Sequence, residues 1–285
     1  MEPLSLKTRR FYSALFFVLF LIILPIVTLY ASGYRIKGLG LVSTGGIYIA
    51  VPVSGFTLSL NGEELERSNL FSKSFFFDNL APGSYVVQAV AEGYYPWSKT
   101  LFVESQLVSD VSVLAITQPL SVREVVTKSP QEEVGTSTVV VVTRERYDTI
   151  ESIFLVTTTP VISSELASEP PADVRGGVAL VVEEGNLFMR FERDSQPPSS
   201  FCIRPSSCAQ VFALEKGSET VTDAQFFAGG VLYRTRESGV YFTEADVRAP
   251  RLTIPIFTTP NARFEVIDGV LTVADETSYY EVTGF

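Results

Sequence analysis

Residues 45–62 read GGIYIAVPVSGFTLSLNG, and apolar side chains alternate with polar or small ones in both halves of this stretch. Alternation with a period of two residues is typical of strands that bury one face. Asn61 and Gly62 end the stretch, and both residue types tolerate the positive φ angles of a tight hairpin turn. The stretch therefore predicts two half-buried strands followed by a hairpin turn, which is typical of an all-β protein.

The same pattern continues toward the C-terminus. Turn-forming sequences such as LAPG at residues 80–83 separate short apolar segments. We expect further strands at residues 74–78, 85–90, 101–103 and 108–116. No ten-residue window in this part of the chain shows a convincing helical period. Residues 46–117 are therefore interpreted as an antiparallel β-sandwich.

Three short motifs in this region resemble those of the PEGA domain, a small β-sandwich module of bacterial and archaeal envelope proteins. They are AVPVSG at residues 50–55, LAPGSY at residues 80–85 and AEGY at residues 91–94. The last two match best, whereas the Pro-Glu-Gly-Ala of the family is replaced by PVSGF, with one residue more and no acid. The resemblance covers about a quarter of the chain. It implies a sandwich fold in a membrane-anchored envelope protein and says almost nothing about a ligand.

Residues 118–285 are expected to form a second β-rich region. Three segments, at 177–188, 230–242 and 269–280, each begin with Gly-Val and continue as an apolar strand, an acidic turn and an aromatic strand. Residues 139–156 are interpreted as a fourth, degenerate copy. The three clear copies start 53 and 39 residues apart, a spacing close to that of propeller blades. A small or incomplete propeller-like array and a second sandwich both remain open.

The N-terminal segment is apolar enough to cross a membrane. Residues 11–34 contain no charged side chain, and about 20 apolar residues span a bilayer core of about 30 Å. Pro25 is tolerated in such a helix because no water competes for its backbone partners. We expect a tail at residues 1–10, an anchor at 11–30 and a glycine-containing linker at 31–45 that gives the next unit some freedom.

The flanks of this segment predict its fate and its orientation. A cleaved signal peptide has a shorter apolar region and small residues at the cut. The best candidate cleavage site here is Leu29-Tyr30-Ala31, which has a bulky leucine where a small residue is needed. Basic residues lie mainly before the span, which favours a cytoplasmic N-terminus and extracytoplasmic β regions. An uncleaved single-pass anchor is the prediction, and a cleaved signal peptide is the alternative.

Composition excludes several classes of function. The chain carries a net charge of −10 and its first 30 residues carry +2, so the remainder carries −12. An acidic domain repels phosphate backbones, so we expect no nucleic-acid partner. The sequence contains no histidine, which excludes Ser-His-Asp catalysis and histidine-ligated zinc. We expect no cofactor, no metal and no enzymatic activity, with a hydrolase that uses only carboxylates as a remote alternative.

The two cysteines, Cys202 and Cys208, are separated by five residues. This spacing fits neither a zinc site nor a C-x-x-C redox motif. Outside the membrane a small structural disulfide is the natural interpretation, and two unpaired thiols in a loop are the alternative.

A cluster of aromatic residues and two groups of acidic residues are further candidate sites. Tyr94, Tyr95 and Trp97 follow a turn, where they could close the end of a hydrophobic core or stack on a sugar ring; we expect the core role. The acidic residues near Asn61 and the pair Glu244 and Asp246 lack the spacing of a calcium-binding loop. We expect both acidic groups to lie in solvated hairpin tips.

Together these features predict a non-enzymatic, membrane-anchored scaffold or binding protein of the cell envelope. Its partners would be the lipid bilayer and either an envelope protein or cell-wall glycan. A glycan-binding module that uses exposed aromatic residues is the alternative function.

Overall fold

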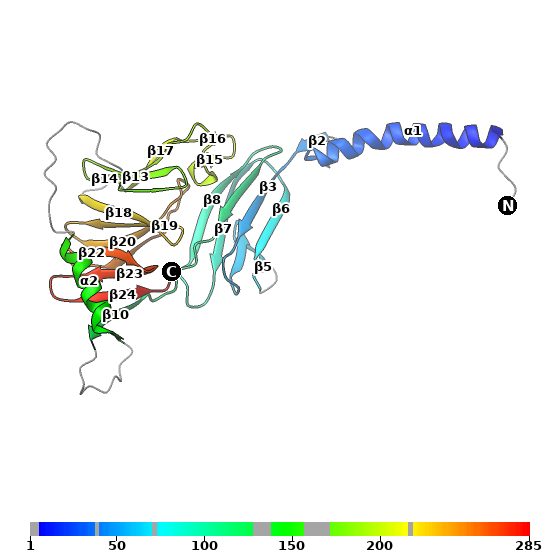
Figure 1. Ribbon diagram of the computed structural model, residues 1–285. Helices are drawn as coiled ribbons and strands as arrows, with labels where there is room; N and C mark the ends of the chain where they lie inside the picture. The colour runs from blue at the N-terminus through cyan, green and yellow to red at the C-terminus, as the bar shows by residue number, and fades with distance from the viewer. Residues whose placement is uncertain (1–5, 38–39, 70–72, 128–137, 157–171, 216–218) are drawn as a thin grey trace.

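The computed structural model describes residues 6–37, 40–69, 73–127, 138–156, 172–215 and 219–285. A long N-terminal helix leads into two β regions, which lie beside each other (Figure 1). We call residues 45–116 the first β region and residues 117–285 the second β region. The expectation of a mostly β chain with one apolar N-terminal helix is confirmed.

The helix α1 (Leu6–Ala31) contains Pro25 in its interior. The most apolar 18-residue window of its segment Thr8–Ala31 has a mean hydropathy of 2.7, and none of that window is buried against the rest of the protein. By length and composition this segment can cross a membrane. In Figure 1, α1 projects away from both β regions.

A β-hairpin follows α1 where a flexible linker was expected. Its strands are β1 (Tyr34–Lys37) and β2 (Gly40–Ser43). The backbone N–H and the hydroxyl of Thr44 both donate to the Gly33 carbonyl at 2.8 Å, and Gln106 N donates to the Thr44 carbonyl at 2.8 Å. These bonds close the hairpin and tie the end of α1 to the first β region, so the described residues of the predicted linker 31–45 form a hydrogen-bonded hairpin.

The first β region contains two sheets that share one hydrophobic core. Three strands form one sheet in the order β6-β3-β9, and four form the other in the order β5-β4-β7-β8. The strands are β3 (Gly45–Ala50), β4 (Thr57–Leu60), β5 (Glu63–Arg67), β6 (Ser74–Leu80), β7 (Gly83–Val90), β8 (Trp97–Val103) and β9 (Val108–Ser112). Alternate residues of both sheets are buried, among them Ile47, Leu58 and Val87.

Two details of this region bear on the sequence-based expectations. The predicted turn between β4 and β5 is confirmed, because Asn61 and Gly62 have φ angles of 52° and 84°. The expectation of a purely antiparallel arrangement is wrong, because β3 and β9 pair in parallel. A parallel pair needs a long crossover connection, and here the four-stranded sheet lies within that connection.

The second β region contains three larger sheets. The first sheet has the order β12 (Asp173–Arg175), β13 (Val178–Glu183), β14 (Asn186–Phe191), β17 (Val211–Glu215). The second has the order β18 (Val221–Phe227), β19 (Gly230–Thr235), β20 (Gly239–Glu244), β21 (Thr253–Phe257). The third has the order β11 (Val139–Val142), β10 (Ser121–Thr127), β24 (Tyr279–Thr283), β23 (Val270–Ala274), β22 (Arg263–Ile267).

These three sheets stack in layers, as Figure 1 shows from β13 through β19 to β24. One apolar cluster joins the first sheet to the second, and another joins the second to the third. Strand β19 is buried on both faces, which explains its nearly continuous apolar sequence. All three Gly-Val segments form antiparallel hairpins, as predicted, through the pairs β13–β14, β19–β20 and β23–β24.

The predicted fourth hairpin, at residues 139–156, is wrong. Strand β11 pairs in parallel with β10, and the chain then forms the helix α2 (Arg144–Val156). Thr143 caps this helix, because its hydroxyl accepts a hydrogen bond from Arg146 N. Ile150 and Phe154, four residues apart, bury one face of α2 against the third sheet. Helical spacing and a capping residue therefore decide the structure of this segment.

Candidate functional site at the junction of the two β regions

A buried ion pair joins the two β regions. Lys99 lies on β8 and is fully buried, and its Nζ lies 2.6 Å from Oε2 of Glu244 at the end of β20. The same ammonium group donates to the carbonyl oxygens of Arg248 and Pro250, both at 3.0 Å. Its three protons therefore have three acceptors, all from the second β region.

Trp97 completes this arrangement from the first β region. Its side chain is 1% exposed and packs in the core between the two sheets, and its Nε1 donates to Oε1 of Glu244 at 2.9 Å. Each carboxylate oxygen of Glu244 thus accepts a hydrogen bond from a different side chain of β8. We call Trp97, Lys99 and Glu244 the junction triad. A buried charge of this kind is tolerated only when it is paired and hydrogen-bonded.

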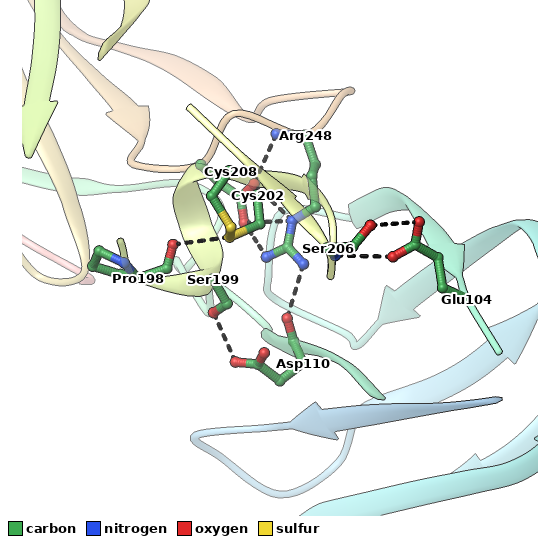
Figure 2. The surroundings of a disulfide bond; sticks show 9 residues. Glu104, Asp110, Pro198, Ser199, Cys202, Ser206, Cys208 and Arg248 are labelled. Carbon is green, nitrogen blue, oxygen red and sulfur yellow. Dashed lines mark hydrogen bonds and ion pairs between the residues drawn. A yellow bond between two sulfur atoms is a disulfide. The ribbon is translucent and has the colours of Figure 1, made fainter. Parts of the chain in front are cut away.

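A second buried ion pair lies a few residues farther along. Arg248 donates from Nε and Nη2 to the carboxylate of Asp246, with the Nη2 contact at 2.5 Å. Its Nη1 donates across the junction to the backbone carbonyl of Asp110 on β9, at 2.8 Å (Figure 2). The planar fork of the guanidinium group therefore fixes both the loop after β20 and the edge of β9.

The disulfide loop forms a third contact. A disulfide joins Cys202 and Cys208, which lie on the short paired strands β15 (Cys202–Arg204) and β16 (Ser207–Cys208). At the tip of this loop, the backbone N–H and the hydroxyl of Ser206 donate to the carboxylate of Glu104 at 2.9 and 2.8 Å (Figure 2). These two hydrogen bonds lower the pKa of Glu104 below its usual value.

Two hollows lie beside these contacts, and we call them together the junction groove. They measure about 320 and 550 Å³ and share Asp110, Ser199 and Arg248 in their walls. Ser199 begins the short helix η1 (Ser199–Phe201), and its hydroxyl lies 2.7 Å from the Asp110 carboxylate. The floor is strand β9, which among the strands that the structure describes pairs only with β3. The Asp110 carbonyl on the free edge of β9 is already bonded to Arg248, so the groove offers the strand edge at Ser112 and the exposed Asp110 carboxylate.

The predicted aromatic candidates do not form one exposed surface. Trp97 is buried in the junction triad. Tyr94 is half-buried and its ring lies 5.1 Å from that of Phe56. Tyr95 is half-buried and packs against the cluster between the second and third sheets. These three side chains thus pack in different places, and none of them lines the junction groove.

The prediction that Glu244 and Asp246 lie in a solvated hairpin tip is wrong. Both are buried, at 5% and 6% exposure, and each pairs with a buried cation. Asn61, in the other acidic group, is exposed as expected. Within the part of the chain that the structure describes, no group of three or more acidic or cysteine side chains could hold a metal ion.

Sequence reasoning missed a pair of interacting carboxyl groups. Asp223 on β18 and Glu265 on β22 are half-buried, and burial raises the pKa of each. The charge of Asp223 raises the pKa of Glu265 further, and Arg234 acts on both in the opposite direction. Neither carboxyl lines the junction groove. The two lie on separate sheets, so no local sequence signal links them.

Comparison with known proteins does not assign the chain to a family. No family model matches the sequence, and no curated protein is significantly similar to it.

Proposed function

We propose that this chain is a non-enzymatic scaffold or binding protein, anchored in the cell membrane by α1, that presents its two β regions outside the cytoplasm. The junction triad is the observation that carries this proposal. A fully buried lysine with three acceptors from the other region favours a single rigid unit over two independently mobile modules. Such a unit is suited to holding a binding surface at a fixed position near the membrane.

The proposed orientation rests on the charges around α1 and on the cysteines. Lys7, Arg9 and Arg10 precede the apolar segment, which favours a cytoplasmic N-terminus. A disulfide between Cys202 and Cys208 persists in an oxidising compartment, which agrees with an extracytoplasmic second β region.

We further propose a PEGA-type sandwich for the first β region and a partial propeller for the second. Two sheets around one core support the first assignment. In the second region, β10 from the start joins β24 from the end in one sheet, as in the closing blade of a propeller. Helix α2 covers the outer face of that sheet, where a further blade would otherwise pack.

The junction groove is the proposed binding site, and an extended segment of an envelope protein is the proposed partner. In the parallel pair β3–β9, the backbone groups of Ser112 point away from β3. They can pair with an added strand, a common mode of peptide recognition. Glycan binding is the second candidate, but Tyr94, Tyr95 and Trp97 do not supply a shared stacking surface for it.

Site-specific photo-crosslinking in the native host tests this proposal. A benzophenone amino acid replaces Ser112 in the groove or, as control, Val174, which is 51% exposed on β12. We expect one discrete protein adduct from position 112 and none from position 174. An adduct removed by cell-wall-degrading enzymes would favour the glycan function. Equal labelling from both positions, or none from position 112, would contradict binding in the groove.

A further inference from the structure

The outer face of the three-stranded sheet carries exposed apolar side chains. Tyr48 on β3 pairs directly with Phe76 on β6, and they are 40% and 57% exposed. Val108 on β9 lies opposite Gly46 on the same face and is 46% exposed, and it also borders the smaller hollow of the junction groove. Its neighbour Leu107 is 40% exposed. We call Tyr48, Phe76, Leu107 and Val108 the outer-sheet patch. An exposed cluster of this kind marks an interaction surface more often than isolated apolar residues do.

The local backbone brings Phe76 and Leu107 together over a glycine. A β-carbon at Gly46 would lie 3.0 Å from the Phe76 ring, so the ring rests directly on the bare backbone there. Gly46 N also donates to the Leu107 carbonyl at 3.0 Å. Phe76, Leu107 and Val108 thus all adjoin Gly46 and line one hollow with it.

The patch begins where the apolar helix ends. One hollow of about 450 Å³ is lined both by Tyr30 and Gly33, at the end of α1, and by Phe76, Leu107 and Val108 of the patch. In Figure 1, the sheet that contains β3 and β6 lies on the side of the first β region nearest to α1. A helix that crosses the bilayer thus places this patch beside the membrane surface.

Hydrogen bonds fix this placement. Gly33 accepts two hydrogen bonds from Thr44, and Thr44 accepts one from Gln106, the residue before Leu107. On the helix side, Arg35 donates to the Tyr30 carbonyl at 2.8 Å, and its guanidinium lies 3.7 Å from the centre of the Tyr30 ring. Tyrosine and arginine are residues that favour the level of the lipid headgroups, where the apolar part of the side chain is buried and the polar end stays in water.

We propose that the outer-sheet patch is a second membrane contact, which inserts shallowly between the lipid headgroups and holds the first β region against the bilayer. This inference rests on the proposed anchoring by α1. The occupant is lipid because the patch is continuous with the membrane-spanning segment, whereas a second copy of the chain or another protein would have to fit between the patch and the headgroups. The side chains of the patch are uncharged, and the exposed carboxylates of Asp110, which pairs with Tyr48, and of Asp78 border it. The contact therefore does not require anionic lipid.

Fluorescence quenching in reconstituted vesicles tests the inference. The full-length chain is placed in phosphatidylcholine vesicles without reductant, so that the native disulfide leaves only one introduced thiol for an environment-sensitive fluorophore. The label is attached to Phe76→Cys or Val108→Cys in the patch, to Phe20→Cys in the span, or to Val174→Cys as the distant exposed control. Two sets of vesicles carry nitroxide groups either just below the lipid headgroup or near the end of the acyl chain, and each set quenches fluorophores that lie at its own depth.

We expect strong quenching at Phe20 by the deep nitroxide and at both patch positions by the shallow one, each at least threefold greater than at Val174. These values should change little between 0.1 and 1 M salt. Quenching at Phe20 with patch values equal to Val174 would overturn the inference while leaving the anchor intact. No quenching at Phe20 would overturn the anchor itself, and the inference with it. A patch that is unquenched but crosslinks between copies would assign the surface to self-association.

Discussion

Replacing Lys99 by methionine should strongly destabilise the protein. Methionine fills a similar volume but donates no hydrogen bond, so the Glu244 carboxylate would stay buried without its cation. It would keep the hydrogen bond from Trp97 Nε1 and a longer one, 3.4 Å, from Leu252 N. Removing one partner of a buried ion pair costs about 3–5 kcal/mol. That is a large part of the roughly 5–15 kcal/mol by which a domain is stable.

Urea unfolding of the full-length chain in detergent measures this cost, and two further variants sharpen the result. Lys99→Met combined with Glu244→Leu removes both charges and should recover most of the loss, because well-packed apolar pairs often replace buried ion pairs at little cost. Arg190→Met breaks the ion pair of Arg190 with Glu183, two side chains that are 36% and 50% exposed. The loss of this exposed pair should lower the unfolding free energy by less than about 1 kcal/mol. The reasoning about the junction triad would be refuted if Lys99→Met lowered the unfolding free energy no more than Arg190→Met does. It would also be refuted if the double variant were as unstable as Lys99→Met alone.

Three further predictions concern other described residues. Trp97→Ala should cost roughly 3–5 kcal/mol, as expected for a large buried aromatic residue, and wild-type stability in a thermal scan would instead favour a ligand-stacking role. Cys202 and Cys208 should be disulfide-linked in protein from the native host, and two freely alkylated thiols in mass mapping without reductant would count against both the pairing and the orientation. For Asp275, burial would raise the pKa, but the hydrogen bonds that its carboxylate accepts lower it overall. The ionised Asp275 carboxylate therefore stabilises the fold fully at pH values above the pKa that it has in the unfolded chain. This stabilisation is lost as the pH falls through its lower pKa in the folded protein. Asp275→Asn should lower the unfolding free energy by about 0.5–1 kcal/mol at pH 7, because the amide oxygen still accepts the three hydrogen bonds made to Oδ1 but without the negative charge. The difference should shrink below about pH 4, and an undiminished difference at about pH 2.5 would contradict this assignment.

Local patterns in the sequence predicted much of the β structure. Period-two alternation located strands of the first β region, and the requirement for positive φ at Asn61 and Gly62 located a turn. The three Gly-Val hairpins were also predictable, because each is closed by residues adjacent in the sequence. The repeat pattern mispredicts residues 144–156, because the Thr143 cap and the helical spacing of Ile150 and Phe154 favour a helix there.

The candidate site was much less predictable. Lys99 and Glu244 are 145 residues apart in the chain, so nothing near either residue indicates a buried partner. Glu244 and Asp246 look like ordinary surface acids until Lys99 and Arg248 are placed against them. The parallel pairing of β9 with β3, which leaves one edge of β9 open to the groove, also depends on contacts distant in sequence. Sequence patterns report local periodicity, whereas these features follow from tertiary packing.

Labelling of single cysteines in intact cells of the native host tests the central claim most directly. Ser5→Cys reports on the tail before α1, and Val174→Cys reports on an exposed position in the second β region. With a membrane-impermeant maleimide and no reductant, the account predicts rapid labelling at position 174. Position 5 should react only after the membrane is permeabilised, on a full-length chain that sediments with the membrane. Labelling at position 5 alone, or a soluble mature chain that has lost its N-terminus, would contradict the account.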